Sequence, residues 1–211
     1  MSVVLGLCYG AAYVGGWAVI RAAADAASKE SRPRPTLWGV GLWCVVAIPS
    51  LLQIALPGML AAGRRDAAAI ADGEWWRLVT SMGLQDGGWF GTLFNLVALA
   101  ISVAVVGEVF SGPMLIVTFV SGGVIGNLLT LAVFGDSGAG NSMATMFMVA
   151  AAAVVATYGR RRSHRLQAPM VVLIATTVVL CALRDQHGFA LASGLVVGLG
   201  LARFEPDSVS P

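Results

Sequence analysis

The chain has 211 residues, of which 57% are hydrophobic and only 11% are charged, and its formal net charge is +2. A soluble domain carries about 25% charged residues, so this composition excludes an ordinary soluble globular protein. The small net charge, held in loop clusters, also argues against a nucleic-acid-binding protein.

The charges interrupt apolar runs that are long enough to cross a lipid bilayer as helices. These runs lack the alternation of apolar and polar residues that marks barrel strands. The sequence therefore predicts an all-α polytopic membrane protein. Seven spans are expected, at residues 2–20, 37–60, 89–107, 114–134, 141–158, 169–183 and 187–202.

The first run favours a spanning helix over a signal peptide cut within residues 22–27, because its basic residues follow the apolar segment. Residues 61–88 are too polar to span, and their tryptophans favour a loop lying in the membrane interface. The predicted organisation is an extra N-terminal helix with a basic linker, a six-helix core and a polar cytoplasmic tail. These parts cover residues 1–36, 37–204 and 205–211.

Basic residues near the ends of the spans predict the orientation of the chain. Alternation of the spans puts nine Lys or Arg residues on one side, in the 21–36 and 159–167 loops and at Arg203, against four on the other. We therefore expect a multi-pass protein of the cell membrane with Met1 outside and the tail in the cytoplasm.

The same alternation places three polar residues near the outer face of the membrane. Ser142 and His187 each begin a helix that descends from this face, and Asn95 lies about 9 Å below the start of another. Polar groups at membrane depth are costly and usually functional. A neutral imidazole takes the proton of a serine nucleophile, and an Asn amide or a free N–H at a helix start stabilises an oxyanion. The three residues predict acyl-transfer chemistry at the outer face.

Each of these residues has a structural alternative. A serine in a membrane helix commonly bonds its own backbone or packs on a neighbour, and a helix-terminal His187 can bond a carbonyl oxygen. His164 lies among arginines and is expected to be a solvated loop residue. Asp185 is expected to be a solvated turn carboxylate, so the sequence favours a dyad over a triad. Ser137, in a glycine-rich loop, is a weaker candidate nucleophile than Ser142.

Small residues follow His187 at intervals of four along its helix. Ala190, Gly194 and Gly198 share one face, which permits close approach of another helix, such as the one that carries Ser142. The three cysteines lie in apolar runs without pairing or metal-ligand spacing, so neither a disulfide, a metal site nor a cofactor is expected. They are Cys8, Cys44 and Cys181.

Several short segments together resemble the rhomboid family of intramembrane proteases. The segment Glu74-Trp75-Trp76-Arg77-Leu78-Val79-Thr80-Ser81-Met82 resembles the first-loop signature of that family. Asn95, the Gly140-Asn141-Ser142 segment and His187 with its following small residues agree with the family in order and spacing. The resemblance covers about residues 37–204 and implies a rhomboid-like six-helix core plus one extra N-terminal transmembrane helix.

The resemblance also implies a serine–histidine dyad that cleaves transmembrane protein substrates in the lipid bilayer. On matching positions, Ser142 would be the nucleophile and His187 the base. Asn95 and the Ser142 N–H would form the oxyanion hole, and Trp76 and Arg77 would hold the interfacial first loop.

Three residues depart from the family pattern. Gly91 stands where the family usually has a histidine, Met143 where it tends to have glycine, and Met146 where an aromatic residue commonly lies against the base. Loss of one oxyanion donor lowers a rate by a factor on the order of 10²–10³. A catalytically inactive rhomboid-like protein that binds transmembrane clients is therefore the alternative. A transporter or channel ranks last, because the spans hold no clear internal carboxylate.

Overall fold

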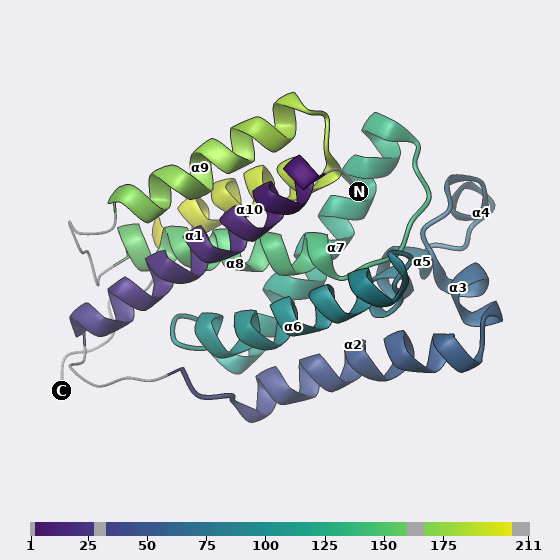
Figure 1. Ribbon diagram of the computed structural model, residues 1–211, viewed down its shortest axis with the longest axis horizontal. Helices are drawn as coiled ribbons and strands as arrows, with labels where there is room; N and C mark the ends of the chain where they lie inside the picture. Colours follow the sequence, from purple (N-terminus) through teal and green to yellow (C-terminus); the bar gives the residue numbers. More distant parts are fainter. Residues whose placement is uncertain (1–2, 28–32, 160–166, 204–211) are drawn as a thin grey trace.

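The computed structural model describes residues 3–27, 33–159 and 167–203. These residues form an all-helical fold with one isolated β-bridge between Arg65 and Gly138 (Figure 1). The elements are α1 (Val3–Ala27), α2 (Leu37–Ala55), α3 (Gly58–Gly63), α4 (Ala67–Ala71), α5 (Arg77–Thr80), a 3-10 turn η1 (Ser81–Gly83), α6 (Gly88–Val106), α7 (Gly112–Phe134), α8 (Ser142–Tyr158), α9 (Gln167–Ala182) and α10 (Gln186–Arg203).

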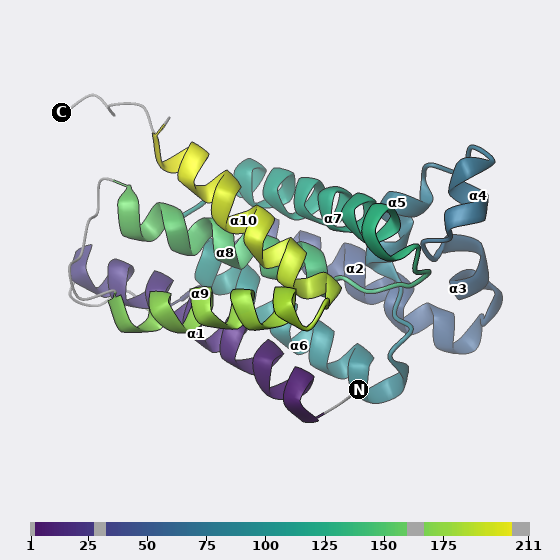
Figure 2. The ribbon, with the colours of Figure 1, turned by 90° about the horizontal axis from the view of Figure 1, so that it is seen from above.

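Helix α8 is the centre of the bundle. Every residue from Met143 to Ala156 is buried, and α8 is in contact with α10, α7, α1 and α6. A helix that is apolar on all sides is buried either in a protein core or in lipid, and here other helices cover it. The long apolar run that opens at Ser142 is therefore an interior helix (Figure 2).

Helix α1 is an integral part of this bundle. It lies along α9 and α8 and also reaches α6, so it joins helices from both halves of the chain (Figures 1 and 2). A Cβ atom on Gly16 would stand 2.3 Å from the Val149 side chain, so α1 and α8 approach closely because residue 16 is glycine. Trp17 adds a hydrogen bond from Nε1 to Ser102 Oγ on α6, at 3.0 Å.

The short elements α3, α4, α5 and η1 gather at one end of the bundle, where α8 and α10 begin (Figure 1). The buried side chain of Arg65 ties this end together. Its guanidinium donates to the Asp136 carbonyl at 3.0 Å, to Asn127 Oδ1 at 2.6 Å and to Gln186 Oε1 at 3.0 Å. One side chain therefore links the 61–88 loop to α7, to the loop before α8 and to the start of α10.

Each predicted apolar run corresponds to a helix, although the 37–60 run is broken at Pro57 into α2 and α3. Within the described ranges, four helices are long and apolar enough to cross a membrane: residues 3–26, 37–55, 88–106 and 112–134. Helices α8 and α9 are apolar but shorter. The protein is thus a multi-pass, all-helical membrane protein. Lys29, Arg32, the basic cluster with His164, and the tail from residue 204 onward lie outside the described residues.

Candidate active site

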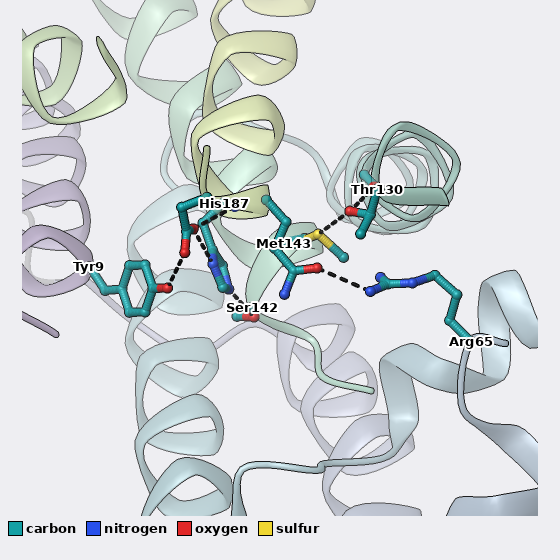
Figure 3. Close-up of polar contacts among 9 residues, drawn as sticks. Tyr9, Arg65, Thr130, Ser142, Met143 and His187 are labelled. Atoms are coloured by element: carbon teal, nitrogen blue, oxygen red, sulfur yellow. Dashed lines mark hydrogen bonds and ion pairs between the residues drawn. The ribbon is translucent and has the colours of Figure 1, made fainter. Parts of the chain in front are cut away.

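The Ser142 hydroxyl and the His187 imidazole are hydrogen-bonded. The distance from Ser142 Oγ to His187 Nε2 is 2.8 Å, and the imidazole is buried (Figure 3). Ser142 is the first residue of α8 and His187 the second of α10. The two residues are 45 positions apart in sequence, so their contact depends on how α8 and α10 pack.

Small residues on α10 lie where this helix meets α8. A Cβ atom on Gly194 would stand 2.5 Å from the Phe147 carbonyl oxygen, and one on Gly198 would stand 2.7 Å from that of Ala151. Ala190 is completely buried. Because such distances are far below van der Waals contact, any larger residue at Gly194 or Gly198 would push the two backbones apart.

Asp185 is hydrogen-bonded to the second nitrogen of the imidazole. Its Oδ1 lies 2.8 Å from His187 Nδ1 and also accepts the His187 backbone N–H at 2.9 Å. Its Oδ2 accepts the Tyr9 hydroxyl at 2.7 Å. The carboxylate side chain is only 13% exposed, so the prediction of a solvated turn carboxylate is wrong. The reason is that α1 packs beside the α9–α10 turn and covers it with Tyr9.

Burial raises the pKa of Asp185, but its hydrogen bonds with His187 and Tyr9, and the attraction of His187 when the imidazole is protonated, outweigh burial and lower the pKa below its ordinary value. Asp185 is therefore an anion at neutral pH. An ionised carboxylate only accepts hydrogen bonds, so the proton between the two groups belongs to His187 Nδ1. This assignment leaves Nε2 with a lone pair for the Ser142 hydroxyl.

On the other side of Ser142 lies a cluster of amides. Asn95 Nδ2 donates to Gln85 Oε1 at 2.7 Å, and Gln85 Nε2 donates to Asn141 Oδ1 at 2.7 Å. A Cβ atom on Gly140 would lie 3.5 Å from Asn95 Nδ2, 3.6 Å from Gln85 Oε1 and 3.7 Å from Ser142 Oγ. The Asn95 amide, the Gln85 amide and the Ser142 hydroxyl thus surround the space over Gly140.

The start of α8 also has backbone N–H groups that the helix itself does not use. The Asn141 side chain makes no capping bond to the helix, and the first helical bond runs from Thr145 N to Asn141 O at 2.9 Å. The N–H groups before Thr145, beginning with that of Ser142, carry the partial positive charge of a helix start.

The three departures from the family pattern have structural accounts. A Cβ atom on Gly91 would find no atom within 4 Å, so this position borders open space. Met143 turns toward α7, where its sulfur lies 3.5 Å from Thr130 Oγ1 (Figure 3). A Cβ atom on Gly126 would stand 3.2 Å from the Met143 Cβ. Met143 therefore fits here because residue 126 is glycine. Met146 is buried in the bundle core.

The remaining predicted residues lie outside this cluster. Arg77 donates to Glu74 and to the Ala61 and Arg64 carbonyls at 3.0 Å each, whereas the Trp76 side chain is 56% exposed. Ser137 is exposed, and its hydroxyl lies 3.4 Å from Asp66 Oδ2. The geometry therefore brings together Ser142, His187 and Asn95, and it leaves Ser137 apart from any described imidazole.

Sequence reasoning missed Gln85 and Tyr9. Gln85 stands in a polar loop, and nothing in its local pattern separates it from solvated neighbours. Tyr9 did leave a signal, because Tyr9 and Tyr13 are four residues apart and place two hydroxyl-bearing rings on one face of an apolar helix.

Comparison with known proteins gives one family match and one partial likeness. A model of the Rhomboid domain matches residues 72–205. The chain is 30% identical over 115 residues to probable cobalt/nickel-exporting P-type ATPases of Mycobacterium bovis and of two strains of Mycobacterium tuberculosis. That match covers 48% of this chain, which spans only 17% of the length of these relatives. No solved structure matches. Since the Rhomboid match covers well over half of the 211 residues, the chain belongs to the rhomboid family.

Proposed function

We propose that this chain is an intramembrane serine protease that cleaves transmembrane protein substrates with Ser142 as nucleophile and His187 as general base. The observation that carries the proposal is the 2.8 Å hydrogen bond between Ser142 Oγ and His187 Nε2. Family membership supports the same reaction class. A serine hydroxyl is a weak nucleophile unless an adjacent base removes its proton, and this geometry supplies that base.

In the proposed reaction, Ser142 Oγ attacks the carbonyl carbon of the scissile peptide bond while its proton passes to His187 Nε2. The C–N bond then breaks, and His187 returns the proton to the leaving amine. The acyl group remains on Ser142 as an ester. Water, activated by His187, attacks this ester and releases the carboxylate product and the free Ser142 hydroxyl.

The negative oxygen of the tetrahedral intermediate would be stabilised by the Ser142 N–H and by Asn95 Nδ2. One Asn95 N–H is already given to Gln85, which fixes the amide plane and leaves the second N–H for the substrate. Water for the second step has a place nearby. A cavity of about 220 Å³ lies between α2, α3 and α6, and Gln85 lines one of its sides together with Gln53, Pro57, Trp89 and Thr92.

The proposal includes an architecture of six core helices from residues 37–204 plus α1, all crossing the cell membrane. The active site then faces the extracytoplasmic side, and the 61–88 loop, held by Trp76 and Arg77, lies in the interface. The distribution of basic residues supports this orientation. Substrate helices would have to unwind near the outer face, because a hydrogen-bonded helix shields its carbonyl groups from attack.

Active-site labelling tests the nucleophile. The full chain, purified in detergent, is treated with a fluorophosphonate probe and assayed for cleavage of a transmembrane reporter. We expect labelling and cleavage for the wild type and for Ser137→Ala, and loss of both for Ser142→Ala. His187→Ala should lower both by a factor of about 10² or more, the usual contribution of a general base. Wild-type protein that neither labels nor cleaves would refute the protease proposal.

A second candidate is an inactive rhomboid-like protein that binds transmembrane clients. It is favoured by Gly91, which leaves open space where the family usually has a histidine. Co-purification of a client without cleavage would support it. The likeness to metal-exporting ATPases covers 17% of those proteins and carries no transport function over to this chain.

A further inference from the structure

We infer that Asp185 and Tyr9 are positioning residues for His187, so that the active site is a chain of four side chains, Ser142–His187–Asp185–Tyr9, completed by the N-terminal helix α1. This inference rests on the proposed function and extends it beyond a dyad.

The four side chains are joined in sequence by short hydrogen bonds. The distances are 2.8 Å from Ser142 to His187, 2.8 Å from His187 to Asp185 and 2.7 Å from Tyr9 to Asp185 (Figure 3). Asp185 fixes the imidazole tautomer that exposes the Nε2 lone pair to Ser142. When the Ser142 proton arrives on Nε2, the carboxylate stabilises the imidazolium that forms and stays ionised itself.

Tyr9 acts on both partners. Its hydroxyl donates to the Asp185 oxygen that His187 does not use, which prevents rotation of the carboxylate. Its ring lies against the imidazole, with 4.4 Å between ring centroids and a 50° angle between planes. Met146, at the position where the rhomboid pattern commonly has an aromatic residue, is buried in the core. Here the aromatic contact to the base comes from α1.

Asp185 also has a purely structural role, because Oδ1 accepts the His187 backbone N–H at the start of α10. The test must separate that role from positioning. Asp185→Asn does so, because an asparagine side chain caps a helix about as well as aspartate but carries no charge. Tyr9→Phe removes one hydroxyl and keeps the ring. Tyr13→Phe is the matched control: it lies one turn further on α1, and its hydroxyl makes no hydrogen bond to Asp185 or His187.

The kinetic test measures kcat, KM and the pH profile of reporter cleavage. Among the described residues, the titratable groups near His187 are Tyr9 on α1 and Asp185 at the α9–α10 turn, with Cys181 of α9 close to Asp185. We expect Asp185→Asn to lower kcat by about 10- to 100-fold, the range of a lost charge-assisted hydrogen bond, with KM unchanged. The acidic limb of the profile should move to lower pH, because the imidazolium loses its counter-charge. Tyr9→Phe should lower kcat several-fold, and Tyr13→Phe should not change it. Unchanged kcat and pH profile in Asp185→Asn would overturn the inference.

A second measurement does not depend on proteolysis. The chain has two histidines, so His164→Gln leaves His187 as the single imidazole in a ¹⁵N spectrum. We expect the Nδ1–H tautomer in this background and its loss on adding Asp185→Ala, which removes the acceptor oxygen. An Nε2–H tautomer would overturn the inference. If the Nδ1–H tautomer is found but the wild type neither labels nor cleaves, positioning by Asp185 stands and the protease proposal fails.

Discussion

Gln85 joins the polar groups on the Asn95 side of Ser142. Its side chain accepts from Asn95 and donates to Asn141 and, at 3.2 Å, to Ser50 Oγ. It is 3% exposed, so these bonds are not replaced by water when they are lost. In the proposed reaction, it would hold the Asn95 amide in the orientation that points a free N–H at the oxyanion.

Replacing Gln85 with Met keeps the side-chain length but removes both hydrogen-bonding ends. We expect kcat for a transmembrane reporter to fall by about tenfold or more, because the oxyanion donor loses its orientation, while KM stays the same. Gln85→Glu should retain part of kcat, since one carboxylate oxygen still accepts from Asn95. Equal kcat for wild type and Gln85→Met would show that Asn95 needs no such support.

Gly91 offers a test by gain of activity. A Cβ atom placed here meets no atom within 4 Å, so the first atom of a histidine side chain has room. If this position lacks an oxyanion donor, Gly91→His should raise kcat by about tenfold or more, because one such donor accounts for a factor of 10²–10³ in other enzymes. Gly91→Ala is the matched control and should leave kcat unchanged. Equal rates for the two variants would mean that the donor is not missing.

Individual residues of the candidate site were predictable from the sequence where a polar side chain lies within an apolar run or at its start. Ser142, His187 and Asn95 stand out because they interrupt or open apolar runs. Asp185 and Tyr9 did not, because their contact joins residues 176 positions apart and exists only once α1 packs on the α9–α10 turn. Hydropathy indicates which segments are apolar and not which helices pack against one another.

At the scale of elements, the contact between α8 and α10 sets the distance between Ser142 and His187, the proposed nucleophile and base. Gly194 lies seven residues beyond His187 on the face that meets α8, and a methyl group there would stand 2.5 Å from the Phe147 carbonyl oxygen. A methyl group added to Gly200, on the same helix, would meet no neighbouring atom within 4 Å. The two glycines thus differ in packing alone.

We expect Gly194→Ala to destabilise the protein by about 1–3 kcal/mol, the usual cost of overpacking, and to lower cleavage at least tenfold by moving His187 away from Ser142. Gly200→Ala should stabilise α10 slightly, by up to about 1 kcal/mol, because alanine favours the helix. Thermal unfolding in detergent and reporter cleavage measure the two effects. Similar behaviour of the two variants would contradict the importance of this contact.

Helix positions were predictable because the apolar runs are long and end at clear signals. Helix α7, for example, begins with Pro113 in its first turn and ends at Gly135, which has the left-handed backbone conformation (φ 69°). The break at Pro57 and the short elements of the 61–88 loop were not predicted in detail. Their positions depend on tertiary bonds such as those of Arg65, which reaches α7 and α10.

At the scale of the whole molecule, α1 is the element whose position the sequence did not predict. The sequence predicts α1 as an addition to the core. In the structure, α1 packs on α8 and α9 and places Tyr9 beside Asp185. The reason is physical: apolarity alone does not select a partner helix, and α1 is placed by close packing, as at Gly16, and by hydrogen bonds such as that of Tyr9 with Asp185. The end of α1 with Tyr9 therefore has to share a membrane face with Ser142 and His187.

The proposed orientation gives the last prediction. In a variant whose three cysteines are replaced, single cysteines are introduced at Asp72, beside the active-site end, and at Arg203, at the far end of α10; both positions are exposed. A membrane-impermeant maleimide added to intact cells should label Asp72→Cys at once and Arg203→Cys only after permeabilisation. The basic residues near the spans favour this arrangement because positively charged loops are retained in the cytoplasm. The reverse pattern would turn the Ser142–His187 pair toward the cytoplasm, and substrates would then have to be cut at their inner ends.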